Sequence, residues 1–341
     1  MSDDKKYMQL AIDQAKKGEG RTSPNPIVGA VIVKKRRIIG MGYHRKAGMP
    51  HAEVNALKAA GKAARGAALY VNLEPCDHFG RTPPCTDAII KSGIKKVIIG
   101  MKDPNPLNNG RGIKKLKDSG IKVIIRILEK EAKSINKPYI KFITKKMPYI
   151  TVKVAQSLDG KIAAKTGDSK WISSEDSRRY VHRLRAGADA VMVGANTVLK
   201  DDPELLSRVS VCRQPLRVIV DGSRRIPVSA KIFSNDKYPV ILASSICGGS
   251  KRTDLAALMK ALAKRGVVNI IVEGGGELIA GLIEKGMVDK MLIFIAPKVI
   301  GGRDAITAVE GIGCTRIKDA VNFNIVNVRY FKKDILIEAE K

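Results

Sequence analysis

Residues 68–85 read ALYVNLEPCDHFGRTPPC, and the fold of the first half of the chain is built around this stretch. The apolar run 68–73 predicts a buried strand, and Pro75-Cys76 follow it after Glu74. Residues 84–92 are predicted to form a helix that contains the second cysteine, and residues 51–64 are predicted to form the helix before the strand. Strands that alternate with helical patterns indicate an α/β layered sheet.

The same alternation extends outward in both directions. In the first half we predict helices over 4–17 and 112–119 and strands over 27–33, 38–43, 96–101 and 121–125. A second α/β series follows, with helices expected over 174–185 and 255–264 and strands over 149–155, 190–193, 216–220, 240–243, 268–272, 291–296, 324–330 and 334–338. Between the two series, over 137–148, prolines and lysines weaken the pattern. We therefore expect two α/β domains, residues 1–146 and residues 147–341.

The composition excludes several classes of protein. Hydrophobic residues make up 44% of the 341, so the chain can bury a core and wholesale disorder is excluded. No apolar run approaches the ~18–20 residues of a membrane span, and the N-terminus lacks a signal-peptide core. Five cysteines make no disulfide framework. We expect a cytoplasmic protein that does not associate with membranes, and we expect it to form a homo-oligomer.

The net charge of +29 raises the question of whether the protein binds nucleic acid. The basic excess is spread over both halves, and its densest cluster, Lys34-Lys35-Arg36-Arg37, falls where a hairpin turn is expected. Aromatic residues make up only 4% of the chain, so platforms for stacking bases are few. A solvated lysine-rich surface is the better interpretation, and its field would also suit an anionic small-molecule substrate.

One histidine and two cysteines predict a metal site. His51 opens a predicted helix, and Cys76 and Cys85 follow the strand. One imidazole and two thiolates suit zinc and leave a fourth position for water, whose pKa zinc lowers to about 7. Glu53 lies two residues from His51, near the metal but free to move protons. Zinc deaminases carry this combination in an H-x-E…P-C-x-x-C signature, in which the Glu is the general acid and base.

The spacing of the cysteines departs from that signature, because eight residues rather than two separate Cys76 from Cys85. Within this insert, His78 and Arg81 could bind an anionic substrate. The alternatives are a structural zinc site with His78 as its fourth ligand, or two buried cysteines that never meet. A structural site has no need of a carboxylate two residues from its histidine, so Glu53 favours catalysis.

Four segments carry a resemblance to a known family: Ser23-Pro24-Asn25-Pro26, His51-Ala52-Glu53, Pro75 to Cys85, and Asp103-Pro104-Asn105-Pro106. Together they resemble the deaminase half of the bifunctional riboflavin-biosynthesis deaminase/reductases, whose long step between the cysteines differs from the C-x-x-C of cytidine and tRNA adenosine deaminases. The resemblance implies a cytidine-deaminase-like three-layer domain, zinc at His51, Cys76 and Cys85, and proton transfer by Glu53. It also implies pyrimidine contacts from Asn25, Asp103 and Asn105, although both asparagines could instead cap turns beside prolines.

Two stretches of the second half contain further candidate site residues. Residues 272–278, VEGGGEL, follow a strand and open a helix, and their glycines let backbone N–H groups approach a phosphate. A plain tight turn is the alternative. Residues 193–203, VGANTVLKDDP, place a glycine just beyond a strand, followed by polar groups and paired aspartates. Lys153 and Asp159 lie upstream, and Trp171 is the only tryptophan. Solvated surface would explain each of these features separately.

Together these features resemble the reductase half of the same family, so that the resemblance covers nearly the whole chain. It implies a dihydrofolate-reductase-like fold that uses NADPH, with cofactor contacts at Ala155, Trp171, Thr197, Asp201, Gly275, Gly276 and Gly281. It implies substrate contacts at Ser169, Arg185, Leu205, Arg208 and Glu273. Arg185 and Arg208 would face a ribose 5-phosphate, since guanidinium binds phosphate in a bidentate fork. Ordinary surface arginines are the alternative. Lys153 and Asp201 are the candidates for moving protons at the opening sugar.

The resulting hypothesis is a bifunctional enzyme of riboflavin biosynthesis. Its first domain would hydrolytically remove an exocyclic amine from 2,5-diamino-6-(ribosylamino)pyrimidinone 5′-phosphate, with zinc as cofactor. Its second domain would transfer hydride from NADPH to C1 of the ring-opened ribose and give the ribityl chain. One rival hypothesis is a nucleic-acid base deaminase, which the scarce aromatics and the long insert oppose. Another is a non-catalytic zinc-stabilised binding module, in which Glu53→Gln would change only stability.

Overall fold

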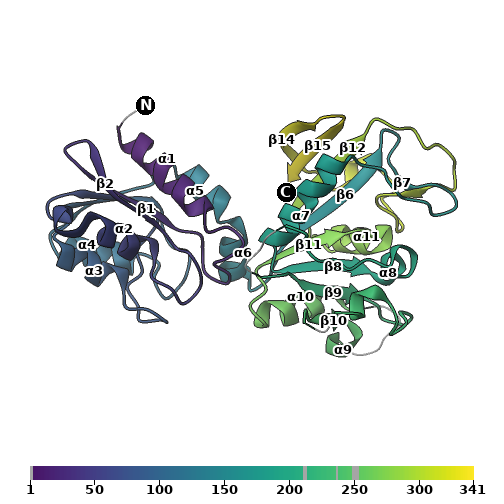
Figure 1. The fold of residues 1–341 in the computed structure, drawn as a ribbon, viewed down its shortest axis with the longest axis horizontal. Coiled ribbons are helices and arrows are strands. Elements are labelled where there is room, and N and C mark those ends of the chain that lie inside the picture. The colour runs from purple at the N-terminus through teal and green to yellow at the C-terminus, as the bar shows by residue number, and fades with distance from the viewer. Residues whose placement is uncertain (1–2, 210–212, 236, 248–252) are drawn as a thin grey trace. The chain divides into compact units, whose positions relative to one another are not determined.

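The structure is a computed structural model that describes residues 3–209, 213–235, 237–247 and 253–341. Two units make up the chain, Met1–Lys146 and Met147–Lys341. Each unit has its own sheet (Figure 1). Each also has its own buried apolar core. Within the described ranges, no helix combines the length and the apolar character needed to cross a bilayer.

The first unit is a five-stranded sheet between two layers of helices. Its strands, in the spatial order β2-β1-β3-β4-β5, are β2 (Arg37–Tyr43), β1 (Gly29–Lys34), β3 (Ala68–Leu73), β4 (Lys96–Met101) and β5 (Lys122–Ile125). Strand β1 is antiparallel to both of its neighbours, whereas β3, β4 and β5 are parallel. Figure 1 shows α1 (Asp3–Lys16) and α5 (Glu129–Ile135) on one face of the sheet. It shows α2 (Ala52–Ala60), α3 (Cys85–Ser92) and α4 (Arg111–Asp118) on the other.

The central strands of this sheet place the candidate site at one edge. Because helices cover both faces, the strands are mostly apolar, and Ile32, Leu69 and Ile98 are fully buried. The parallel strands β3 and β4 end at the same edge, so the segments that carry Cys76 and Asp103 leave the sheet side by side.

The second unit is an eight-stranded sheet in the order β10-β9-β8-β11-β6-β12-β15-β14, with a small additional sheet of β13 and β7. The strands from β10 to β12 are parallel, and β15 and β14 complete the sheet in antiparallel fashion. The strand bounds are β6 (Tyr149–Ser157), β7 (Lys161–Ala163), β8 (Ala190–Gly194), β9 (Leu216–Val220), β10 (Val240–Leu242), β11 (Asn269–Glu273), β12 (Lys290–Ala296), β13 (Ile306–Thr307), β14 (Asn324–Phe331) and β15 (Asp334–Glu340). The helices are α7 (Glu175–Gly187), α8 (Ala195–Asp201), α9 (Ser244–Cys247), α10 (Leu255–Lys264) and α11 (Gly276–Glu284).

Most predicted elements are present. The strands expected over 68–73, 96–101 and 216–220 have those bounds, and so does the helix expected over 255–264. Residues 137–148 differ from the expectation, because helix α6 (Lys137–Lys145) runs through most of this weakly patterned stretch. Pro138 lies in its first turn, where a missing backbone N–H removes no helical hydrogen bond. The elements β7, α5 and α8 were not predicted, since each has at most seven residues and shows too little of a period.

Candidate functional site

Three segments of the first unit bring the predicted metal ligands together. His51 directly precedes α2, Cys76 follows β3, and Cys85 is the first residue of α3. Their ligand atoms all lie within 4.8 Å of one another. His51 Nδ1 is 3.2 Å from Cys85 Sγ and 3.5 Å from Cys76 Sγ. The alternative in which the two cysteines never meet is therefore wrong.

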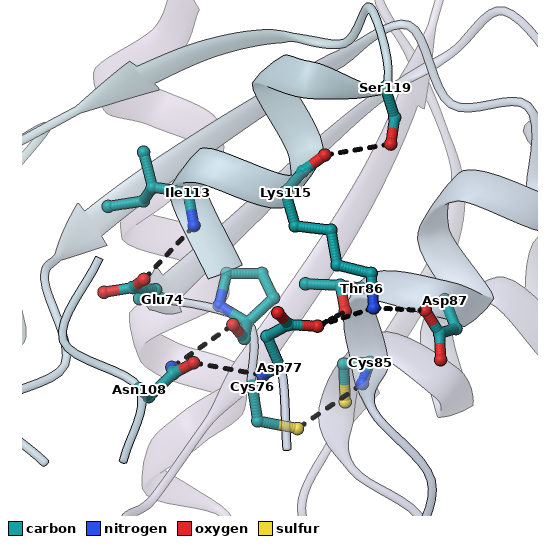
Figure 2. Close-up of polar contacts among 11 residues, drawn as sticks. Glu74, Cys76, Asp77, Cys85, Thr86, Asp87, Asn108, Ile113, Lys115 and Ser119 are labelled. Atoms are coloured by element: carbon teal, nitrogen blue, oxygen red, sulfur yellow. Dashed lines mark hydrogen bonds and ion pairs between the residues drawn. The ribbon is translucent and has the colours of Figure 1, made fainter. Parts of the chain in front are cut away.

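The sulfur atom of Cys76 lies in surroundings that favour a bound cation. The backbone N–H of Cys85 donates a hydrogen bond to Cys76 Sγ at 3.4 Å (Figure 2). The pKa of the Cys76 thiol is lowered, because a hydrogen bond from the Cys85 thiol, joined by one from His51, outweighs burial. Among the described residues the metal-ligating cluster does not include His78, so a closed four-ligand site is not formed. Two thiolates and one imidazole fit zinc with one open coordination position.

Glu53 is buried next to these ligands. It lies in the first turn of α2 with 3% of its surface exposed, and its Oε2 atom has no hydrogen-bond partner. Burial raises the pKa of Glu53 to about 7, so this carboxyl can take up and release a proton near neutral pH. A buried carboxyl oxygen without a partner is costly to the fold, and such groups gather at functional sites.

A cavity of about 370 Å³ opens beside Glu53, which is within the size range of small-molecule sites. Every residue that the resemblance or the insert suggested for substrate lines it: Asn25, His78, Arg81, Asp103 and Asn105. The structure therefore brings the whole predicted set of the first unit together, including the three candidate ligands.

The Asp103 carboxylate is held in place by three donors. It accepts hydrogen bonds from Tyr139 Oη at 2.9 Å, from the Asn105 backbone N–H at 3.0 Å and from Asn108 Nδ2 at 3.2 Å. Burial raises the pKa of Asp103 in spite of these bonds. Asn105 Oδ1 accepts the Leu107 N–H at 3.1 Å, so this side chain caps a turn, as the alternative interpretation expected, while it lines the cavity.

His44 and Thr82 belong to the site but were not predicted. His44 follows β2, is 2% exposed, and meets His51 edge-on with ring centroids 5.0 Å apart. Its Nε2 lies 3.2 Å from the Asn25 amide, and burial lowers the pKa of His44. Thr82 Oγ1 lies 3.3 Å from Nε2 of His51, the ring nitrogen turned away from the cysteines. Metal-ligating histidines are commonly oriented by such a partner.

The second unit contains a larger cavity, of about 650 Å³. The residues expected to contact cofactor or substrate nearly all line it: Lys153, Ala155, Ser169, Trp171, Arg185, Thr197, Asp201, Leu205, Arg208, Glu273 and Gly275. They come from segments as far apart as β6 and the turn after β11, because neighbouring parallel strands end at the same edge of the sheet. His182 also lines this cavity and was not predicted.

A buried ion pair lies in this cavity. Arg185 Nε and Nη2 donate to the two carboxylate oxygens of Glu273 at 2.6 and 2.9 Å, and Nη1 donates to the Leu206 carbonyl at 3.1 Å. Burial alone would raise the pKa of Glu273, but the charge and hydrogen bonds of Arg185, together with Lys153, lower it. Burial lowers the pKa of Lys153. The bidentate fork of Arg185 is thus occupied by Glu273, which leaves it only two of its five donors for a phosphate.

Two of the predicted cofactor residues do not line the cavity. Gly276 and Gly281, both on α11, are absent from its lining, although Gly275 and Ile279 are part of it. A Cβ at Gly281 would come within 3.3 Å of Leu255 Cδ1, so this glycine faces α10. At the cavity itself, Ser169 Oγ donates to Asp201 at 3.3 Å, and the Arg178 guanidinium lies over the Trp171 ring, 4.3 Å from its centroid.

Comparison with known families matches a different family to each half of the chain. Residues 1–101 match the cytidine and deoxycytidylate deaminase zinc-binding region, and residues 148–337 match the RibD C-terminal domain. The chain is 44% identical to the riboflavin biosynthesis protein RibD of Aquifex aeolicus, over 98% of this chain and 97% of that one. It is 38% identical to RibD of Escherichia coli, over 98% of both chains.

Two solved structures have the same fold over nearly the whole chain. Acinetobacter baumannii RibD superposes with a TM-score of 0.90 at 38% identity, covering 99% of this chain and 98% of that one. The Thermotoga maritima diaminohydroxyphosphoribosylaminopyrimidine deaminase/5-amino-6-(5-phosphoribosylamino)uracil reductase gives 0.90 at 39% identity, with the same coverage. These matches confirm the predicted fold class, the two enzyme activities, and zinc and NADPH as cofactors. The chain therefore belongs to the RibD family of bifunctional riboflavin-biosynthesis deaminase/reductases.

Proposed function

We propose that residues 1–146 deaminate 2,5-diamino-6-(ribosylamino)pyrimidinone 5′-phosphate with zinc, and that residues 147–341 then reduce the ribosyl chain of the product with NADPH. One observation carries the proposal: His51, Cys76 and Cys85 meet beside the unpartnered Oε2 of Glu53. Family membership supports both reactions.

In the first unit, His51 Nδ1 and the sulfur atoms of Cys76 and Cys85 would hold the zinc ion. When bound, zinc supplies an activated water near neutral pH. Glu53 Oε2 takes up a proton and delivers it to the departing amine nitrogen, so that ammonia leaves. The raised pKa of Glu53 suits this exchange, because the carboxyl must accept and donate a proton within one turnover.

Substrate contacts in this unit follow from the lining of the cavity. We assign Asn25, Asp103 and Asn105 to the pyrimidine, which offers both donors and acceptors to amide and carboxylate groups. His78 and Arg81, from the insert between the cysteines, are assigned to the anionic phosphate.

In the second unit, NADPH supplies hydride when it is bound. We assign its contacts to Ala155, Trp171, Thr197, Asp201 and Gly275. The substrate contacts are assigned to Ser169, Leu205, Arg208 and the pair Arg185–Glu273. Lys153 and Asp201 move protons at the opening sugar, and the lowered pKa of Lys153 eases release of its proton. We assign the phosphate chiefly to Arg208, since the bidentate donor pair of Arg185 is already hydrogen-bonded to Glu273.

Removal of zinc tests the assignment of the two reactions. Chelation is expected to abolish ammonia release from the diaminopyrimidine ribotide, because the water is then no longer activated. Oxidation of NADPH with the already deaminated ribotide should continue at the untreated rate, since the second cavity is lined only by residues of its own unit. Adding zinc back is the control. Ammonia release that persists without zinc would refute the metal assignment, and loss of both activities would refute the division between the units.

We also propose a cytoplasmic homo-oligomer that acts on a small phosphorylated pyrimidine and not on nucleic acid. The spread of the basic side chains over both halves and the 4% of aromatic residues support a small-molecule substrate over nucleic acid in spite of the charge of +29. We expect single-stranded RNA to leave deamination of the ribotide unchanged when it is added as a competitor at 50 mM salt. Competition that disappears at 200 mM salt would favour the nucleic-acid hypothesis instead.

A further inference from the structure

The eight residues between Cys76 and Cys85 are long enough that the chain itself does not fix the distance between the two sulfur atoms. A fully extended chain reaches at most about 3.3–3.6 Å per residue, so the nine steps from Cys76 to Cys85 would allow ~30 Å. The three steps of a C-x-x-C arrangement would allow only ~10 Å. Residues 77–84 contain no helix or strand that could shorten this reach. The distance between the two sulfur atoms therefore depends on hydrogen bonds and ion pairs made by the residues next to the cysteines.

Some of these contacts join the two cysteine segments directly. The Thr86 backbone N–H donates to the Cys76 carbonyl at 3.2 Å, and Thr86 Oγ1 donates to Asp77 Oδ1 at 2.8 Å. Thr86 is fully buried, so neither bond competes with bulk water. Asp77 and Thr86, the residues that follow the two cysteines, are thus hydrogen-bonded to each other. The Asp77 backbone N–H also donates to Asn108 Oδ1 at 3.0 Å (Figure 2).

One side chain from a third element joins both cysteine segments at once. Lys115, on α4, lies with its Nζ 2.6 Å from Asp77 Oδ1 and 2.6 Å from Asp87 Oδ1 (Figure 2). Asp77 follows Cys76 by one residue, and Asp87 follows Cys85 by two. The ammonium group therefore pairs with one carboxylate from each of the two cysteine segments.

Helix α4 is itself fixed against the segment that carries Cys76. The buried Glu74 accepts backbone N–H groups from Gly110 at 2.9 Å and from Ile113 at 3.2 Å. At Gly112 the helix lies so close that a Cβ would overlap the Pro75 carbonyl oxygen. Contacts with Glu74 and Pro75, which precede Cys76, thus set the position of Lys115, whereas its ammonium group contacts Asp77, which follows Cys76.

We propose that Lys115 is a positioning residue that holds the two cysteine segments at the separation zinc requires. The inference rests on the proposed function, in which Cys76 and Cys85 are zinc ligands. Lys115 touches neither ligand and lies outside the lining of the cavity, so its effect is on the retention and geometry of the metal. Partly exposed ion pairs contribute little to global stability, and we therefore expect the change in zinc binding rather than in folding.

The experiment compares Lys115→Met with Lys114→Met. Lys114 is the adjacent residue of α4 and pairs only with Asp118 on the same helix among the described contacts, so it makes a matched control. Zinc affinity is measured on the full-length protein by competition with a chromogenic chelator, and the visible absorption of the cobalt-substituted protein reports ligand geometry. We expect Lys115→Met to bind zinc about 10-fold more weakly, the lower end for residues that orient metal ligands. Its cobalt spectrum should be altered, and Lys115→Arg should recover most of the affinity.

The outcomes separate this inference from the proposed function. Failure of the unsubstituted protein to bind one zinc per chain would overturn the proposed function itself. If it binds zinc, equal affinities and cobalt spectra for Lys115→Met and Lys114→Met would overturn the role of Lys115. Thermal unfolding of the metal-free variants is measured alongside. A loss of zinc affinity that merely parallels a lower melting temperature, without rescue by Lys115→Arg, would also overturn the proposal.

Discussion

Replacing Glu53 with glutamine is expected to slow ammonia release by about 10²–10⁴-fold, the range that a positioned acid–base group contributes. Glutamine keeps the volume of the side chain but cannot carry the proton from the attacking water to the departing nitrogen. The effect should be confined to the first reaction, because Glu53 lines the cavity of the first unit and does not line the cavity of the second. The measurement is ammonia release from the diaminopyrimidine ribotide by zinc-loaded protein.

Two controls accompany this variant. Glu19→Gln changes an exposed glutamate of the same unit and is expected to leave ammonia release unchanged. Oxidation of NADPH with the deaminated ribotide reports whether the second unit of the Glu53→Gln chain is intact. Ammonia release that stays within a few-fold of the unsubstituted protein, with zinc bound, would favour a non-catalytic zinc module.

The second large effect is expected at the ion pair of the reductase cavity. In Glu273→Gln, Arg185 and Lys153 remain in the cavity without their counter-charge. Removing one partner of a buried pair lowers the free energy of unfolding by about 3–5 kcal/mol. The side chains of Arg185 and Glu273 are only 16% and 8% exposed, so solvent screens this loss little. NADPH oxidation should be lost as well, whereas ammonia release by the first unit should persist.

The double variant Arg185→Met/Glu273→Met separates stability from function at this site. Replacing both members of a buried pair by apolar groups is often close to neutral, so the double variant should be more stable than Glu273→Gln to urea at pH 7. It should nevertheless remain unable to oxidise NADPH, because the polar contacts that we propose for the substrate are missing. A double variant less stable than Glu273→Gln would show that the pair matters through packing and not through charge.

The pair also predicts a dependence of stability on pH. The pKa of Glu273 is lower in the folded protein than its ordinary value of 4.5. The stability that it contributes is therefore present above about pH 4.5 and is lost as the pH falls through the lower folded-state pKa. The difference in unfolding free energy between the unsubstituted protein and Glu273→Gln should accordingly shrink on acidification.

Local sequence patterns were enough to predict the helices and strands whose apolar residues follow a long, regular period. The strand 68–73 and the helix 255–264 have the predicted bounds. A strand buried on both faces gives a continuous apolar run, and a helix buried along one stripe gives a helical apolar period, so both can be read from the sequence. The zinc ligands could be named for a similar reason. Histidine, glutamate and two cysteines in this order match the ligand chemistry of zinc and the zinc-deaminase signature, and the structure brings the three candidate ligands together.

What escaped prediction depends on contacts between distant segments. His44 approaches His51 only because β2 pairs with β1 and ends beside the start of α2. Thr82 lies in an insert without regular structure, where no period places its side chain. The pairing of Arg185 with Glu273 joins residues far apart in the sequence, so two expected substrate contacts are largely bonded to each other. The sequence around neither residue indicates that the two form an ion pair.

Because each cavity is lined by residues of a single unit, defects in the two reactions should complement one another. A cell that carries one gene copy with Glu53→Gln and another with Glu273→Gln still makes one intact site of each kind. The released pyrimidine of one polypeptide can then be consumed by the other, and growth without added riboflavin should be restored. In vitro, a mixture of the two variant proteins should show a lag before NADPH oxidation that shortens as the protein concentration rises.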